Sequence, residues 1–299
     1  MFVVLGASGH TGQVVAKDLL ERGQKVRVVG RSAERLQGLA GKGAEIFVAD
    51  LTDAPSLTKA FREVEAAYVL IPPNPTSSDY RAAQERASDA IAAAVQNSGI
   101  KRVVALSSFG ADKASGTGPV VGLHNLEQKL NQIESVDALY LRAGYFMENL
   151  LPQVAVVRMM GSMAGPVVPD VKLPMIATRD IGGAAAEALL DDNFHGKQTR
   201  ELQGQRDITY VEAAAITGKA IGKTSLGYVR ATDDQFRSAL VQMGMSANMA
   251  GLILEMAGAL NSGHMKMLET RTPGNSTRTP LERFVEEEFA PAYREQVAA

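Results

Sequence analysis

The first half of the chain alternates between short apolar runs and longer segments with helical periodicity. The apolar runs that predict strands are residues 2–5, 25–29, 45–48, 67–71, 102–106 and 138–141. The segments that predict helices are residues 11–22, 33–39, 55–63, 79–97 and 120–133. Because the strand segments lack polar alternation, we expect helices to cover both faces of the sheet. The pattern therefore predicts an α/β fold with a doubly wound parallel sheet.

The alternation weakens after residue 150. Residues 151–176 are rich in Met, Pro, Gly and Val, and a helix at 180–190 and a strand at 200–202 are expected to rejoin the sheet. From residue 209 the pattern is mostly helical and ends in a helix at 281–293. We therefore expect a sheet domain of residues 1–150, rejoined by residues 177–205, and a smaller, mostly helical lobe. The lobe comprises residues 151–176 and 206–299.

A glycine-rich turn joins the first predicted strand to the first predicted helix. Its residues are Gly6, Ala7, Ser8, Gly9, His10, Thr11 and Gly12, with the spacing G-x-x-G-x-x-G. Such glycines permit a sharp turn, a close approach to a pyrophosphate and close packing of helix on sheet. The helix N-terminus offers free N–H groups to the phosphates. The turn therefore predicts a Rossmann-type NAD(P)-binding domain, the alternative being a glycine-rich turn without a ligand.

The end of the second predicted strand bears on which dinucleotide is bound. An NAD-selective site would place an acidic residue here, to bind the ribose hydroxyls of the adenosine. This chain has Arg31 instead, with Ser32 and Arg35 close by. A guanidinium can pair with a 2′-phosphate, so NADP(H) is favoured over NAD(H). The alternative is that Arg31 stacks on the adenine or is simply solvated.

The third and fourth predicted strands end in further candidates for the cofactor site. Asp50 is expected to accept a hydrogen bond from the adenine amino group, with Leu51 covering the ring. The alternative role, capping the next helix, is more natural for Thr52 or Asp53. Ile71 and Pro72 end the fourth strand, where the adenosine ribose would pass.

Several segments together resemble a known superfamily. GASGHTG, VVGRS, ADLTD and VVALSSFGA resemble the short-chain dehydrogenases/reductases. LYLRAGYFMENLL and TPLERFVEEEFAPAYRE resemble the NmrA-like family of its atypical branch, and the similarity covers nearly the whole chain. That family includes NADPH-dependent quinone oxidoreductases, triphenylmethane reductases, isoflavone-reductase-like enzymes and a redox-sensing regulator. The resemblance implies a cofactor-binding sheet domain and a substrate-binding lobe.

One departure from the superfamily concerns the chemistry. Standard members use Tyr-x-x-x-Lys to donate a proton, but no tyrosine here has a lysine four residues later. By resemblance the tyrosine position falls on Val120 or Val121, and His124 takes the lysine position. This loss counts against sugar epimerases, dehydratases and ordinary alcohol dehydrogenases.

Three residues are the candidates for catalysis. His124 is expected to bind the nicotinamide ribose or to donate a proton, the alternative being a helix residue whose hydrogen bonds are satisfied by a neighbour such as Glu127. Ser107, at the end of the fifth strand, faces the nicotinamide in this hypothesis, although its hydroxyl could equally bond the local backbone. By resemblance the backbone of Gly144, Tyr145 and Phe146 lines the nicotinamide. The two rings would form an aromatic wall and Tyr145 could donate a proton, or both rings could simply pack the two lobes together.

Composition narrows the function mainly by exclusion. The chain has 45% hydrophobic and 21% charged residues, which is typical of soluble globular proteins. It has no cysteine, which excludes disulfides, thiolate metal sites and a cysteine nucleophile. The net charge of −2, without a basic run, gives no support for nucleic-acid or membrane-surface binding. The four histidines lack the spacing of metal ligands, so we expect no metal site. Because we find no signal peptide and no membrane span, we expect a cytoplasmic protein.

These observations predict an NADPH-dependent oxidoreductase that transfers hydride to a quinone or a similar conjugated or aromatic electrophile. A quinone leaves a stabilised phenolate, so orientation of the cofactor and exclusion of water would suffice with a weak proton donor. The alternative is a non-catalytic, NADP(H)-sensing regulator. An open apolar pocket would favour the enzyme, whereas a filled one would favour the sensor. The oligomeric state stays open, with a homodimer among the options.

Overall fold

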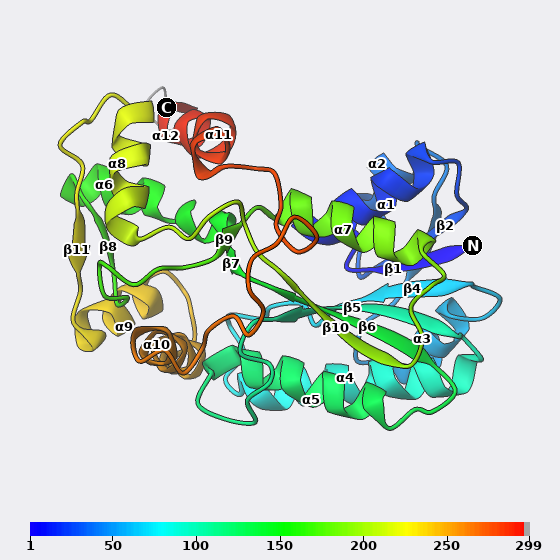
Figure 1. Cartoon of the computed structure of the whole chain (residues 1–299). Coiled ribbons are helices and arrows are strands. Elements are labelled where there is room, and N and C mark those ends of the chain that lie inside the picture. Colours follow the sequence, from blue (N-terminus) through cyan, green and yellow to red (C-terminus); the bar gives the residue numbers. More distant parts are fainter. Residues whose placement is uncertain (296–299) are drawn as a thin grey trace.

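A seven-stranded parallel sheet with helices on both faces forms the larger part of the protein (Figure 1). The computed structural model describes residues 1–295. The strand order is β10-β6-β5-β4-β1-β2-β3, and every pair is parallel. The strands are β1 (Phe2–Leu5), β2 (Val26–Gly30), β3 (Glu45–Val48), β4 (Ala66–Val69), β5 (Arg102–Ser108), β6 (Asp137–Ala143) and β10 (Lys197–Leu202). The order reverses between β1 and β4, so the predicted Rossmann-type fold is confirmed.

Two helical layers cover this sheet. One contains α1 (His10–Glu21), the 3-10 turn Glu34–Leu36, α2 (Gln37–Ala40) and α7 (Thr178–Leu190). The other contains α3 (Ala54–Ala60), α4 (Tyr80–Ser98) and α5 (Val121–Asn131). In β1, Val4 packs toward the first layer while Val3 and Leu5 pack toward the second, and all three are fully buried. Burial on both faces explains why the strand segments lack polar alternation.

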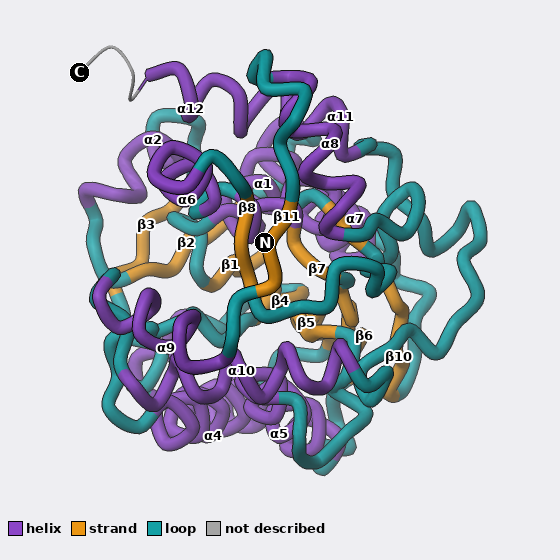
Figure 2. The backbone as a smooth tube through the Cα atoms, turned by 90° about the vertical axis from the view of Figure 1, so that its left-hand side faces the viewer, coloured by secondary structure: helices purple, strands orange, loops and turns teal. Residues whose placement is uncertain are grey.

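A smaller lobe continues from the ends of β6 and β10 and has its own apolar core. Its strands are β7 (Tyr145–Phe146), β8 (Met163–Gly165), β9 (Met175–Ile176) and β11 (Tyr228–Arg230), in the pairs β7–β9 and β8–β11. Its helical segments are the 3-10 turns Gly118–Val120 and Met147–Leu150, α6 (Gln153–Met160), α8 (Tyr210–Ala220), α9 (Asp233–Gln242), α10 (Ala247–Asn261), α11 (Leu281–Phe284), the π-helical turn Val285–Phe289 and α12 (Ala290–Glu295). Figure 2, which looks onto the lobe, shows β8, β11, α9 and α10 in front of the sheet.

The lobe differs from the sequence prediction in detail. It is largely helical, as expected, but residues 262–280 form an irregular segment and β11 interrupts the helices. The strand expected at 200–202 begins earlier, at Lys197, because β10 pairs with residues Ala138 to Ala143 of β6. No helix among the described residues is long and apolar enough to cross a membrane.

Polar contacts attach the lobe to both helical layers. The Glu148 carboxylate accepts from the backbone N–H and the hydroxyl of Thr178, at 2.9 and 2.6 Å, and so caps the N-terminus of α7. At the other layer, the Tyr80 N–H donates to the side-chain oxygen of Asn248, at 2.9 Å. These contacts fix the lobe over the carboxyl ends of the strands, where ligands bind in folds of this class.

Candidate functional site

The carboxyl ends of six adjacent parallel strands bring the predicted site residues to one edge of the sheet. In the order of strands β1 to β6, these ends carry Gly6, Arg31, Asp50, Ile71, Ser107 and Gly144. The sequence predicted this gathering from the strand rhythm alone, because parallel strands all end on the same side. The side chains at this edge nevertheless differ in what they contact.

The glycine turn has the shape that close contact between loop and helix requires. Gly6 has φ +62°, a left-handed conformation that favours glycine. A Cβ on Gly12 would lie 2.4 Å from the carbonyl oxygen of Gly6, so only glycine fits there. Gly9 is less crowded and is exposed at the N-terminus of α1, where no side chain caps the helix. The helix N-terminus is therefore open to an anion.

Two residues of the turn, Thr11 and His10, differ in their surroundings. The Thr11 hydroxyl accepts a hydrogen bond from the buried Tyr68 hydroxyl, at 2.9 Å. Burial raises the pKa of Tyr68, which therefore stays protonated as the donor. His10 is exposed and lines a cavity of about 160 Å³ between α1, α7 and the lobe, with Glu148 and Arg179 in the same wall. The apolar pattern around Tyr68 gave no sign of this bond.

The basic residues after β2 are available to a ligand. Arg31 and Arg35 are exposed, and neither forms an ion pair within residues 1–295. The Ser32 hydroxyl accepts from the Arg35 backbone N–H, at 3.4 Å, which fixes the start of this turn. Two cationic side chains therefore stand at the carboxyl end of β2 with no carboxylate committed to them.

Within the loop after β3, Thr52 provides hydrogen bonds to one carboxylate oxygen of Asp50. One Asp50 oxygen accepts from the backbone N–H and the hydroxyl of Thr52, at 2.8 and 2.7 Å. These bonds, and to a smaller extent the charge of Arg31, hold the pKa of Asp50 below its usual value. Leu51 is 6% exposed and packs into the sheet core, and Asp53 caps α3, one of the two positions predicted for the cap. The adenine contacts of Asp50 and Leu51 stay predictions, as do the roles of Ile71 and Pro72, which are partly exposed after β4.

The Ser107 hydroxyl has a partner that sequence reasoning missed. It donates to a carboxylate oxygen of Glu127 at 2.6 Å, and Ser107 is only 3% exposed. The same carboxylate pairs with Arg142 through two bonds, of 3.0 and 2.6 Å, although Glu127 is 2% exposed. This buried Ser107–Glu127–Arg142 cluster joins α5 to the ends of β5 and β6. The described contacts direct the hydroxyl into the protein, and neither alternative considered from the sequence included this arrangement.

His124 contacts the backbone and not Glu127, the neighbour given as an example in the alternative, and its role stays a prediction. Its Nδ1 lies 2.8 Å from the carbonyl oxygen of Ala111, in the loop after β5. A carbonyl only accepts, so Nδ1 carries the proton of this bond. In the neutral ring, Nε2 is then an acceptor. The partly buried imidazole can therefore receive a hydrogen bond from a ligand hydroxyl.

Gly144 and the two aromatic residues after it form the passage between sheet and lobe. A Cβ on Gly144 would lie 2.1 Å from the Pro174 carbonyl oxygen, so glycine is required where β7 meets β9. Phe146 packs against the sheet core, whereas Tyr145 packs against the lobe core. The two rings thus face different cores, as expected if they join the lobes.

The Tyr145 hydroxyl lies in a tyrosine cluster that the sequence did not predict. It is 2.8 Å from the Tyr210 hydroxyl, and the Tyr210 ring stacks on Tyr228 with centroids 4.6 Å apart. Burial raises the pKa of Tyr145. A tyrosine with a raised pKa and a hydroxyl partner inside the lobe is a weaker proton donor than the Tyr-x-x-x-Lys pair provides.

Comparisons with known proteins agree along the whole chain. Residues 1–289 match the model of the NmrA-like family. The chain is 26% identical over 293 residues to an NAD(P)H azoreductase of Xenophilus azovorans, covering 98% of each protein. It superposes on an NADPH-dependent quinone oxidoreductase of Escherichia coli, complexed with NADPH, with a TM-score of 0.82 and 23% identity over 97% of this chain and 100% of that one. For the triphenylmethane reductase of Citrobacter sp., complexed with NADP(H), the TM-score is 0.82 and the identity 19% over 96% and 99% of the chains.

Proposed function

The chain belongs to the NmrA-like family, and we propose that it is an NADPH-dependent oxidoreductase that reduces a quinone or a similar conjugated or aromatic electrophile. The observation that carries the proposal is the glycine turn. Its first and third glycines are fixed by the fold, and it exposes an uncapped helix N-terminus where the strand order reverses. Relatives named as NAD(P)H azoreductase and NADPH-dependent quinone oxidoreductase support the same reaction class.

The residues present fit NADPH. Gly6 to Gly12 and the N-terminus of α1 would hold the pyrophosphate, and Arg31 with Arg35 would hold the 2′-phosphate. Nε2 of His124 would accept from a nicotinamide ribose hydroxyl, since Ala111 fixes the proton on Nδ1. When bound, NADPH supplies the hydride. The backbone at Gly144 would orient the nicotinamide, and the lobe would exclude water.

The site offers only weak proton donors, and this favours a quinone-like acceptor. Ser107 donates to Glu127 and Tyr145 contacts Tyr210, so neither hydroxyl is poised for a strong transfer. The phenolate product of quinone reduction is stable enough to take its proton from solvent. A simple ketone would require a stronger acid.

A non-catalytic NADP(H) sensor is the second hypothesis, and one feature of the lobe counts against it. A sensor without turnover needs no space for a substrate, whereas the lobe encloses a cavity of about 500 Å³ that begins at Phe109, after β5. The substrate would be a small molecule. A cytoplasmic location and a homodimer stay predictions from the sequence.

Two measurements test the proposal together. NADPH oxidation is followed at 340 nm with quinones, enones and aromatic carbonyls, and NADPH binding is titrated directly. We expect turnover with at least one quinone. Tight NADPH binding without turnover on any acceptor would refute the enzyme and favour the sensor.

Arg31→Ala tests the choice of cofactor. Loss of a charge-assisted contact with the 2′-phosphate should weaken NADPH binding by roughly tenfold. NADH, which lacks that phosphate, should bind as before. An unchanged NADPH affinity would remove the 2′-phosphate role from Arg31, and Arg62→Ala, on the sheet's other helical layer, is the matched control.

A further inference from the structure

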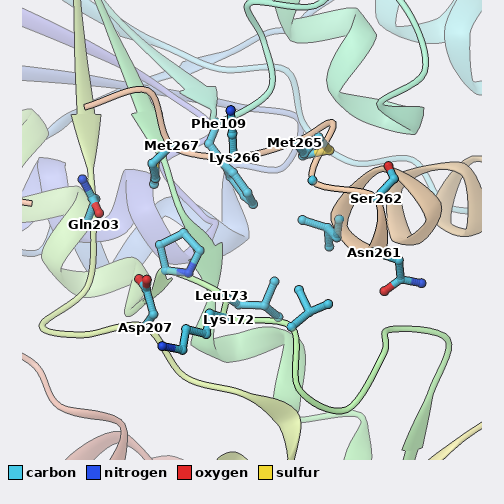
Figure 3. A pocket seen from close by; sticks show the side chains of 14 residues that line it. Phe109, Lys172, Leu173, Gln203, Asp207, Asn261, Ser262, Met265, Lys266 and Met267 are labelled. Carbon is cyan, nitrogen blue, oxygen red and sulfur yellow. The ribbon is translucent and has the colours of Figure 1, made fainter. Parts of the chain in front are cut away.

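A cavity of about 500 Å³ lies between the end of α10, the irregular segment after it, the start of β9 and the end of β10 (Figure 3). Its volume is within the usual range of small-molecule sites. None of the residues assigned to the cofactor lines it. Its apolar lining includes Phe109, Val171, Pro174, Met265 and Met267.

The cavity begins where the nicotinamide is proposed to lie. Phe109 follows β5 directly, and its N–H donates to the Ala143 carbonyl at 3.0 Å. Pro174 and Met267 both crowd Gly144, since a Cβ there would lie 2.1 Å from the Pro174 oxygen and 3.2 Å from the Met267 methyl. A substrate in this cavity would therefore lie next to the ends of β5 and β6.

Half of the fourteen lining side chains are apolar, and the neutral polar side chains beside them make hydrogen bonds within the protein. Asn261 accepts from the Val168 N–H at 2.8 Å and donates to the Pro166 carbonyl at 3.1 Å. The Gln203 amide donates to the Glu269 carbonyl at 3.0 Å. These hydrogen bonds hold the wall of the cavity together.

The charged side chains leave a positive surplus in the wall. Asp207 is ion-paired with Arg271, which lies outside the wall. Lys172 and Lys266 are exposed and form no ion pair of 4.0 Å or less within residues 1–295. Lys172 also feels the charge of Glu212, but Glu212 caps α8.

The two lysines lie on opposite sides of the cavity. Figure 3 shows Lys172 near Asp207 and Lys266 on the segment that carries Met265 and Met267. A ligand between them would meet apolar groups along its body and a cation at either side. Methionine walls adapt to flat ligands of differing outline.

We propose that this cavity binds the substrate, and that Lys172 and Lys266 select conjugated substrates that carry an anionic group such as a carboxylate. The proposal rests on the proposed function, since it assigns the substrate class of the same site. The apolar wall would bind the ring system, and the two ammonium groups would attract the anion. Neutral analogues would bind through the wall alone.

The test uses two substrates that differ only in charge, 3-(1,4-naphthoquinon-2-yl)propanoate and its methyl ester. Steady-state NADPH oxidation gives kcat/KM for each, and the ratio of acid to ester isolates the effect of the carboxylate. We expect a ratio of about three to ten in the native protein at low salt, because exposed ion pairs contribute modestly. The ratio should fall toward one in high salt.

Two variants identify the groups responsible. The double variant K172Q/K266Q should bring the ratio to about one, whereas Lys101→Gln, at the amino end of β5 and far from the cavity, should retain the native ratio. A native ratio near one, or a double variant that keeps the preference, would overturn the proposal.

Val171→Trp, which fills the cavity, tests where the substrate binds. It should weaken turnover of acid and ester alike while NADPH still binds, and an unaffected turnover would place the substrate elsewhere.

A binding measurement separates this proposal from the proposed function. The non-reducible 3-(2-naphthyl)propanoate is titrated calorimetrically into the protein with NADPH present. Binding that K172Q/K266Q weakens, without turnover of either quinone, would support the cavity assignment and refute the oxidoreductase. Absence of binding by this probe, together with equal turnover of acid and ester, would refute the cavity assignment alone.

Discussion

The contact between Gly12 and the glycine turn gives the sharpest test of the cofactor site. In Gly12→Ala, the new methyl carbon would lie 2.4 Å from the Gly6 carbonyl oxygen, 2.8 Å from its carbon and 3.1 Å from the Ala7 Cα. All three atoms are backbone, so no rotamer change relieves the overlap. Either α1 or the turn must shift.

The expected cost follows from two opposing effects. Overpacking typically costs about 1–3 kcal/mol, and a clash with backbone belongs at the upper end of that range. Alanine is favoured over glycine inside a helix by about 1 kcal/mol, which offsets part of this cost. The net loss is about 2 kcal/mol, or a fall of about 3 °C in Tm for a chain of this size. The displaced turn should also weaken NADPH binding by tenfold or more.

Gly258→Ala is the matched control. Gly258 is exposed inside α10, and no atom lies within 4 Å of the place that an alanine methyl group would take, so alanine should raise stability by up to about 1 kcal/mol. Thermal unfolding and NADPH titration of both variants decide the question. Native Tm and native NADPH affinity in Gly12→Ala would refute the close contact and the argument built on it.

Two further predictions concern buried charge. Arg142→Met leaves the Glu127 carboxylate buried with only Ser107 as partner, and should lower the free energy of unfolding by about 3–5 kcal/mol, measured by urea unfolding. The double variant with Glu127→Gln should recover part of this loss. An equally large loss in the double variant would contradict this explanation. Burial raises the pKa of Glu201 despite N–H bonds from Glu269 and Leu268. The native protein therefore binds a proton that the unfolded chain releases near pH 4.3, and this group's contribution to stability falls as the pH rises toward the native pKa. Between about pH 4.5 and pH 7, the urea midpoint of Glu201→Gln should fall less than that of the native protein. An equal fall in both proteins would show that Glu201 does not cause this pH dependence.

Much of the site could be predicted from local sequence because local sequence decides it. The G-x-x-G-x-x-G turn sits between a strand and a helix, and its crowding at Gly12 arises within seven residues. The position of Arg31 follows from the length of β2. Parallel strands then bring these segments to one edge whatever the rest of the chain does.

The roles of individual polar side chains could not be predicted in this way. Ser107 ends near the predicted place, but its hydroxyl is directed by Glu127, 20 residues later. Tyr145 contacts Tyr210, 65 residues later. These partners meet only after α5 and α8 have packed. Hydrophobic periodicity does not predict which buried carboxylate or hydroxyl will lie next to a given strand end.

Local patterns in the chain were enough to predict the doubly wound sheet, the glycine turn and the basic end of β2, because each depends on backbone conformation and hydrophobic period over short spans. The tertiary structure decided the buried Ser107–Glu127–Arg142 cluster, the tautomer of His124 and the lysine-rimmed cavity of the lobe. Each of these depends on burial and charge balance among segments far apart in the chain, since a polar group's partner is chosen by proximity in the folded state. The proposed substrate preference therefore depends on the lobe, where the sequence pattern is weakest.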